Sequence, residues 1–238
     1  MARHLLAVLN RYFDLESLPP GASNEALREL YALRYEVFCT ECGFMPPADY
    51  PDDLEYDAYD PAAAHFSARN TEGRVVGASR LVLVSAGSAF PYQAHCQPFA
   101  DFVAPESTES AEVSRLAIHS SYRRRAGDTL SGVNPADAEG PRKPGTRGAD
   151  KRVNAPLLTL GLYREMYRYS CANGIRYWYA AMERPLVRIL SLYGFPFKPI
   201  GPEQDYHGPV TPYMGDLRDF ETHLRGVNEE LLAWFQHG

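Results

Sequence analysis

The stretch that decides the fold is "AEVSRLAIHSSYRRRAG", from Ala111 to Gly127. It begins as an apolar run typical of a buried strand, yet Glu112 and Arg115 lie near its start. On a regular strand these two side chains would point to opposite faces, because their spacing is odd. A β-bulge between them would bring both to one face, and bulges are frequent next to active sites. The pattern therefore predicts a strand that presents charged groups to a site; the alternative is a strand-edge glutamate facing solvent.

Two further arginines fall on apolar faces upstream of this strand. Arg34 lies on the apolar stripe of a predicted helix, "SNEALRELYALRYEVF", and Arg80 lies in the apolar strand "RVVGASRLVLV". A buried guanidinium keeps its charge and needs a carboxylate partner. Asp57 and Asp60, three apart in "LEYDAYD", can point to one side of a turn and supply it. We expect an ionic network, which could equally be structural and hold the helix against the sheet.

The rest of the chain alternates between helical and strand patterns, which predicts a single α/β domain over residues 1–238 with a mixed sheet flanked by helices. "VNAPLLTLGLYREMYRYSCANG" reads as a long helix that ends at Asn173 and Gly174. Further elements are expected as strands at 64–70, 74–84, 112–118, 175–182, 197–200 and 210–217, and helices at 184–195 and 219–235.

Three consecutive arginines, Arg123, Arg124 and Arg125, follow the predicted strand at 112–118. Ligands of α/β sheets bind at strand ends, and arginines there can hold a phosphate, although most charge runs are solvated surface. The segment from Arg123 to Arg152 has no periodicity and holds eight Lys/Arg against four Asp/Glu. We interpret it as a flexible basic insertion at about 123–152.

Composition restricts the class of protein. The net charge of −6 argues against a nucleic-acid binder, and 45% hydrophobic with 23% charged residues is typical of a soluble globular protein. No run approaches the ~20 apolar residues of a membrane span, and we find no signal peptide, so a cytoplasmic protein with at most peripheral membrane contact is expected. Cys39 and Cys42 have metal-ligand spacing, but without a second such pair we expect small buried residues and no metal. No HExxH, GxSxG, Walker A or GxGxxG pattern is present.

Taken in order, "LRYEVF…GF", "EYDAYD", "GASRLVL" and "EVSRLAI" resemble the acyl-homoserine-lactone autoinducer synthase superfamily. Within it, the chain most resembles the PEP-CTERM/exosortase-associated acyltransferases, which are similar to N-acyl amino acid synthases. The resemblance covers about residues 10 to 218. It implies a GNAT (Gcn5-related acyltransferase) fold and transfer of a fatty acyl group from acyl carrier protein to the amine of an amino acid or related small molecule. The site residues that it implies are Arg34, Phe38, Asp57, Asp60, Arg80, Glu112 and Arg115.

The same resemblance suggests what the product is. Phe44 stands where the lactone synthases carry Trp, as in the amino-acid branch, which argues for an N-acyl amide rather than a lactone. "AIHSSYRRRAG" resembles a degraded GNAT pyrophosphate loop, which suits the single phosphate of a carrier-protein phosphopantetheine. No tightly bound cofactor is expected; acyl-phosphopantetheine, or acyl-CoA, is the co-substrate.

We expect the acyl thioester to lie between the strand at Glu112 and the strand at 175–182. Backbone N–H groups near Leu116 and Ile118 would stabilise the oxyanion, and Glu112 would accept the proton of the amine, with Ser114 a weaker candidate as relay. The arginine triplet would bind the phosphopantetheine phosphate and attract the acidic carrier protein. A stripe of apolar residues is a candidate lining of the acyl pocket, although core packing is the commoner role of such a stripe: Leu157, Leu158, Leu162 and Met166. The alternatives are a GNAT enzyme that uses soluble acyl-CoA, and a non-catalytic GNAT-like module that binds an acyl ligand or partner.

Overall fold

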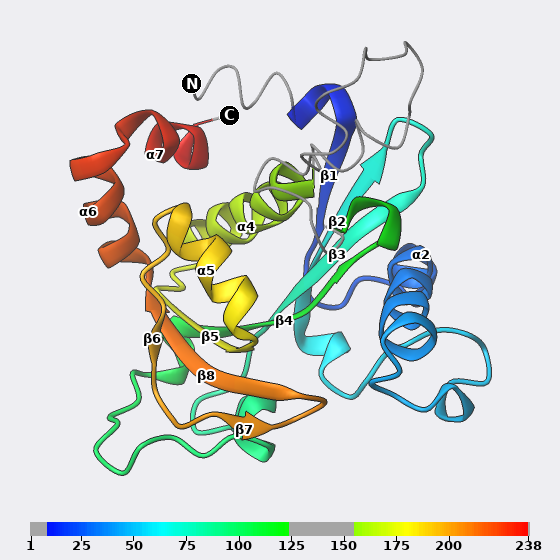
Figure 1. Ribbon diagram of the computed structural model, residues 1–238, viewed down its shortest axis with the longest axis horizontal. Coiled ribbons are helices and arrows are strands. Elements are labelled where there is room, and N and C mark those ends of the chain that lie inside the picture. Colours follow the sequence, from blue (N-terminus) through cyan, green and yellow to red (C-terminus); the bar gives the residue numbers. More distant parts are fainter. Residues whose placement is uncertain (1–8, 124–154, 238) are drawn as a thin grey trace, which may run out of the picture.

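The computed structural model describes residues 9–123 and 155–237, and a twisted sheet runs through it (Figure 1). Neighbouring strands are antiparallel except for one parallel pair, β4 with β5. This confirms the predicted mixed sheet. In spatial order the strands are β1 (Phe13–Leu18), β2 (Ala63–Asn70), β3 (Val75–Val82), β4 (Ser110–Ile118), β5 (Tyr177–Met182), β8 (Pro209–Asp216) and β6 (Lys198–Pro199), while β7 (Gln204–Asp205) pairs with β8.

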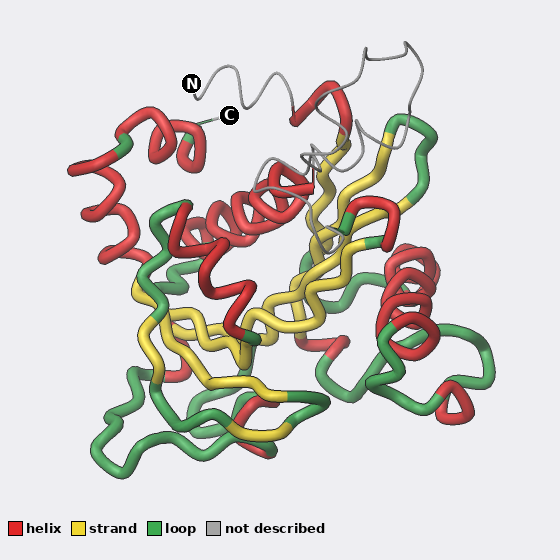
Figure 2. The backbone as a smooth tube through the Cα atoms, in the orientation of Figure 1, coloured by secondary structure: helices red, strands yellow, loops and turns green. Residues whose placement is uncertain are grey.

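Helices cover both faces of the sheet, as Figure 2 shows for the helices α2 (Asn24–Tyr35) and α4 (Ala155–Ala172). The helix α2 begins where expected, because the Ser23 hydroxyl accepts the N–H of Ala26 at 3.3 Å and satisfies one of the free donors of the first turn. A π-helical turn, Glu36–Glu41, extends α2 toward the site. The helix α5 (Arg184–Leu192) follows β5.

Successive side chains of β3 point to opposite faces of the sheet, one covered by α4 and the other by α2. Ser79 contacts the Met166 sulfur of α4 at 3.4 Å, and a Cβ atom on Gly77 would lie 3.0 Å from Leu158 of the same helix. Ala78 packs in the cluster of α2 instead. Arg80 lies on that α2 face as well, since its spacing from Ala78 is even.

The predicted bulge is confirmed in β4. Ala78 of β3 pairs with Ala117, but Arg80, two residues further, pairs with Ser114, three residues back. The strand β4 therefore has one extra residue at this point. The backbone of Arg115 lies at this extra position in the left-handed region, with a φ of 54°, which is uncommon for a residue with a side chain.

The parallel pair β4–β5 is short. It extends only from Ser110 to Glu112 on β4 and from Tyr177 to Tyr179 on β5. Beyond Glu112 the two strands are no longer paired, and the sheet opens at its centre. This is the gap in which the acyl thioester is expected.

Two expectations were wrong in detail. The last helix is two helices, α6 (Leu217–Val227) and α7 (Glu229–Gln236). They are separated at Asn228, whose side chain caps the second helix by accepting the N–H of Leu231 at 3.1 Å. The edge strand β1 was not predicted at all.

In the described ranges no helix is long and apolar enough to cross a membrane. The basic insertion beyond Arg123 lies outside the described residues.

Candidate active site

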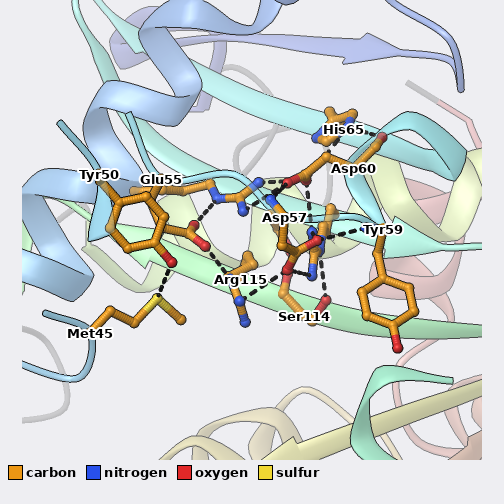
Figure 3. A network of polar contacts seen from close by, with 12 residues as sticks. Met45, Tyr50, Glu55, Asp57, Tyr59, Asp60, His65, Ser114 and Arg115 are labelled. Carbon is orange, nitrogen blue, oxygen red and sulfur yellow. Dashed lines mark hydrogen bonds and ion pairs between the residues drawn. The ribbon is translucent and has the colours of Figure 1, made fainter. Parts of the chain in front are cut away.

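Two of the three arginines, Arg34 and Arg80, form the buried centre of the ionic network. Figure 3 shows its acids Glu55, Asp57 and Asp60 together with Arg115. Arg34 donates from both terminal nitrogens to Asp60, at 2.7 and 3.1 Å. Arg80 binds both oxygens of Asp57, at 2.7 and 2.8 Å, and also reaches Asp60 at 2.7 Å. Both arginines are 1% exposed or less, so water does not screen these contacts. The expectation that buried arginines and aspartates share a dry cluster is confirmed.

The third arginine joins the network through an acid that sequence reasoning missed. Glu55 is fully buried and binds two arginines, Arg34 at 2.5 Å and Arg115 at 3.0 Å. Arg115 also donates to Asp57 at 3.0 Å. The only signal for Glu55 was its place in "LEYDAYD", two residues before the first aspartate.

The network determines the ionisation of its acids. Burial alone would raise the pKa of Asp57, but Arg80 and Arg115 outweigh it and hold that pKa below its ordinary value. The same balance applies to Asp60, where Arg34 and Arg80 keep the pKa well below the usual range. Both groups are therefore carboxylates at neutral pH, and neither is suited to accept a proton.

A cavity of about 740 Å³ occupies the gap between β4 and β5. Its walls come from both faces of the sheet. On the α2 side they include Phe38, Phe44 and His207, and on the other side the α5 residues Leu186 and Ile189. The cavity thus passes from one face of the sheet to the other through the gap.

The helix α4 contributes to this cavity with other residues than expected. Thr159 and Tyr163 line it, whereas Leu158, Leu162 and Met166 are fully buried in the core. Leu157 is only packed against that core. The proposed leucine stripe is a packing surface against β2 and β3, and its assignment to the acyl pocket was wrong.

Glu112 lies beside the cavity rather than in its wall. It is 4% exposed, and burial raises its pKa to about 7. One carboxylate oxygen accepts the N–H of Tyr92 at 2.8 Å. The other has no partner among the described residues and is not a fully buried atom. A carboxylate with a pKa near neutrality and one open oxygen has the properties of a general base.

The bulge also orients backbone donors. The N–H of His119 donates to the carbonyl of Val76 on β3, at 2.9 Å. Because donors alternate along a regular strand, we expect the N–H of Ile118 to point the other way, toward the unpaired edge; Leu116 lies at the bulge itself. Both residues line the cavity, as does Ser114, whose hydroxyl accepts from Arg80 at 3.0 Å.

The remaining described site residues line the cavity. The ring of Phe38 is 6.0 Å from the Arg115 guanidinium, and Phe44 stacks on His207 with ring centres 6.2 Å apart. Arg123 lines the cavity and forms an ion pair with Glu41. Arg124 and Arg125 lie outside the described residues.

The two cysteines with metal-ligand spacing differ in burial. Cys39 is buried, as expected, and Cys42 is half-buried in the cavity wall. Across residues 9–123 and 155–237 no group of three or more His, Cys, Asp or Glu side chains is placed to hold a metal ion.

Sequence comparisons match the chain to acyltransferases. The model of the acetyltransferase (GNAT) domain matches residues 33–132. Acyl-homoserine-lactone synthases of Aeromonas salmonicida and Aeromonas hydrophila are each 26% identical to the chain over 180 residues, which is 76% of this chain and 73% of theirs.

Solved structures show the same fold. The acyl-homoserine-lactone synthase LasI superposes with a TM-score of 0.61 at 20% identity, covering 91% of this chain and 96% of its own. BjaI, a CoA-dependent acyl-homoserine lactone synthase solved with SAM and isopentyl-CoA, gives a TM-score of 0.60 at 20% identity, covering 90% and 89%. The chain has the GNAT fold, and its matches support an acyltransferase. Within that class its sequence is similar to the acyl-homoserine-lactone synthases.

Proposed function

We propose that the protein is an N-acyltransferase that moves a long-chain fatty acyl group from acyl carrier protein to the amine of an amino acid or related small molecule. The bond formed is an amide, and the bond broken is the thioester of the donor. The amine proton passes to Glu112, and the donor sulfur leaves as a thiolate that takes up a proton from the protonated Glu112. The observation that supports this proposal is the cavity between β4 and β5, which Leu116 and Ile118 line beyond Glu112, the last residue of β4 that pairs with β5.

The two ends of the cavity suit different parts of the reactants. Leu186, Ile189 and Leu192 of α5 give the far end an apolar wall that fits a fatty acyl tail. The near end is bordered by Arg115 and Ser114, which fit a polar acceptor. With the thioester carbonyl in the gap, the N–H groups of Leu116 and Ile118 would donate to the oxyanion that develops on it.

The nature of the donor is part of the proposal. Arg123 lies at the cavity wall with its side chain 37% exposed, and a carrier-protein phosphopantetheine could place its phosphate beside it. Acyl-CoA is the alternative donor, since BjaI is described as CoA-dependent. Assignment to the PEP-CTERM/exosortase-associated branch stays a prediction.

A homoserine-lactone product is the second candidate, because the sequence similarity extends over most of the chain to synthases of that class. Phe44 supports the amide instead, through the resemblance of its position to the amino-acid branch. The two candidates differ in the acceptor, and both use an amine as nucleophile.

One experiment separates these possibilities. Purified protein is incubated with acyl carrier protein or CoA charged with the same acyl chain, in the presence of pooled amino acids and S-adenosylmethionine. Products are identified by mass spectrometry, and thiol release is measured in parallel. We expect N-acyl amino acids with the carrier-protein donor, and greatly reduced product with Glu112→Gln.

Lactone product would replace the amide proposal by the second candidate, and faster turnover with CoA would change the donor. Bound acyl ligand without any turnover, by a folded protein and with either donor, would contradict the proposed reaction.

A further inference from the structure

A second cavity, of about 540 Å³, adjoins the edge strand β1, and we call it the edge cavity. Its walls come from residues 10–15, from the turn between β2 and β3, and from the helix α4. It shares no lining residue with the cavity between β4 and β5. Three of its lining residues are arginines, Arg11, Arg164 and Arg168, and two are acids, Asp14 and Glu165. Positive side chains therefore outnumber negative ones around it.

Arg164 has a buried donor that the protein leaves unsatisfied. Its side chain is only 4% exposed. Nε donates to the carbonyl of Trp234 at 2.7 Å, and Nη1 donates to Glu165 at 3.0 Å. Nη2 is buried and has no hydrogen-bond partner in residues 9–123 and 155–237. Buried donors without a partner are rare in folded proteins, and such a donor beside a cavity indicates that something bound there satisfies it.

The charge of Arg164 is also incompletely matched. Arg80 is buried to a similar degree, but it binds two carboxylates, and its pKa lies above the ordinary value. Arg164 has one carboxylate partner among the described residues, and burial and the neighbouring Arg168 hold its pKa below the ordinary value. That carboxylate, Glu165, also lies 3.7 Å from Arg168. A buried cation in this position gains from a further anion.

The other acid of the lining belongs to the opposite face of the sheet. Leu15 of β1 lies against α4, since a Cβ atom on Gly161 would come within 3.2 Å of it. Successive side chains of a strand alternate, so Asp14 points away from α4. Without Asp14, the lining has three arginines against Glu165 alone, a surplus of two positive charges.

We propose that the edge cavity binds a phosphate dianion, either free or as the phosphate group of a small phosphomonoester, with Arg11, Arg164 and Arg168 as its cationic partners. A phosphate offers several oxygens to guanidinium donors at once and matches the surplus of two charges, whereas a carboxylate brings one charge. The volume of the cavity is in the range of sites that take small organic ligands, so there is space for the organic part of a phosphomonoester.

Isothermal titration calorimetry of the full chain at constant ionic strength tests the proposal with inorganic phosphate, phenyl phosphate and acetate as probes. We expect saturable binding of phosphate and at least about 10-fold weaker binding of acetate, which makes fewer charge-assisted hydrogen bonds. Tighter binding of phenyl phosphate than of inorganic phosphate would assign the site to phosphomonoesters, and the reverse would assign it to free phosphate. Absence of saturable phosphate binding, or equal binding of acetate, would overturn the proposal.

Two variants locate the site. Arg164→Gln removes the buried cation but keeps a donor for the carbonyl of Trp234, and it should weaken phosphate binding by about 10- to 100-fold. Arg11→Gln should weaken binding as well. Because Arg11 is exposed, this second variant keeps the test decisive if Arg164→Gln does not fold. Unchanged affinity in the folded variants would overturn the assignment to the edge cavity.

Two matched controls exclude other sources of binding. Arg225→Gln removes an exposed arginine of α6 that lines neither cavity, and Arg123→Gln removes the arginine of the cavity between β4 and β5. Both should bind phosphate as the unmodified protein does. Equal weakening in Arg225→Gln would reduce the effect to general surface charge, and loss of binding in Arg123→Gln would move the phosphate to the other cavity; either result would contradict the proposal.

Discussion

Replacing Glu112 by glutamine should make the protein more stable at alkaline pH while it removes the proposed base. Burial raises the pKa of Glu112 from an ordinary value of 4.5 to about 7. At about 1.4 kcal/mol per pH unit, this difference costs the folded protein roughly 3 kcal/mol once the group is ionised. The unfolded chain loses this proton at lower pH than the folded protein does, so stability falls as the pH rises from about 4.5 through 7.

Glutamine has nearly the same shape and keeps a carbonyl oxygen to accept the N–H of Tyr92. It has no charge to bury. The variant should therefore match the unmodified protein near pH 5 and exceed its free energy of unfolding by roughly 3 kcal/mol at pH 8. Turnover should fall by about 10²- to 10⁴-fold, as expected when a general base is lost.

Urea unfolding at pH 5 and pH 8 measures the first effect, and thiol release from the donor measures the second. Glu109→Gln is the control, because Glu109 is an exposed glutamate three residues away, and the same substitution there leaves the burial of Glu112 unchanged. The same stability difference between variant and parent at both pH values would refute the argument that ionised Glu112 is costly. Normal turnover in the folded variant would refute its role as base.

Three other outcomes follow from the site. Arg80→Met leaves the carboxylates of Asp57 and Asp60 without their main shared partner and should destabilise the fold by about 3–5 kcal/mol in urea unfolding; a loss under about 1 kcal/mol would contradict the network. Arg123→Glu should raise the apparent KM for acyl carrier protein, and added salt should shrink the difference from the parent; an unchanged KM at low salt would contradict docking there. Ala181→Phe puts a large ring into the cavity wall and should lower kcat/KM for long acyl donors more than for short ones, whereas equal losses across chain lengths would argue against an acyl pocket.

Part of the site was predictable because buried charge is rare and therefore informative. Arginines on the apolar faces of a helix and a strand required acids nearby, and this placed Arg34 and Arg80 against Asp57 and Asp60. The odd spacing of Glu112 and Arg115 required a bulge if both were to act together. These arguments need only local periodicity and the cost of an unpaired charge.

Other features depend on tertiary contacts that periodicity does not encode. Glu55 lies in an acidic stretch, "DDLEYDAYD", that reads as a solvated loop in spite of the flanking Leu54 and Tyr56. Its burial follows from α2 lying over the sheet. Leu158 and Tyr163 belong to one helix, and only the position of the gap between β4 and β5 decides which of them faces the cavity. The break at Asn228 was missed because apolar periodicity continues through it into α7.

The passage of the cavity through the sheet has a kinetic consequence for an amphiphilic product. Its head would remain on the α2 side and its tail against α5, with the strands β4 and β5 on either side of the new amide. Such a molecule leaves only by sliding lengthwise, so each added methylene of the tail should slow its departure. Vesicles or micelles that take up the tail as it emerges would then accelerate steady-state turnover without altering the first catalytic cycle.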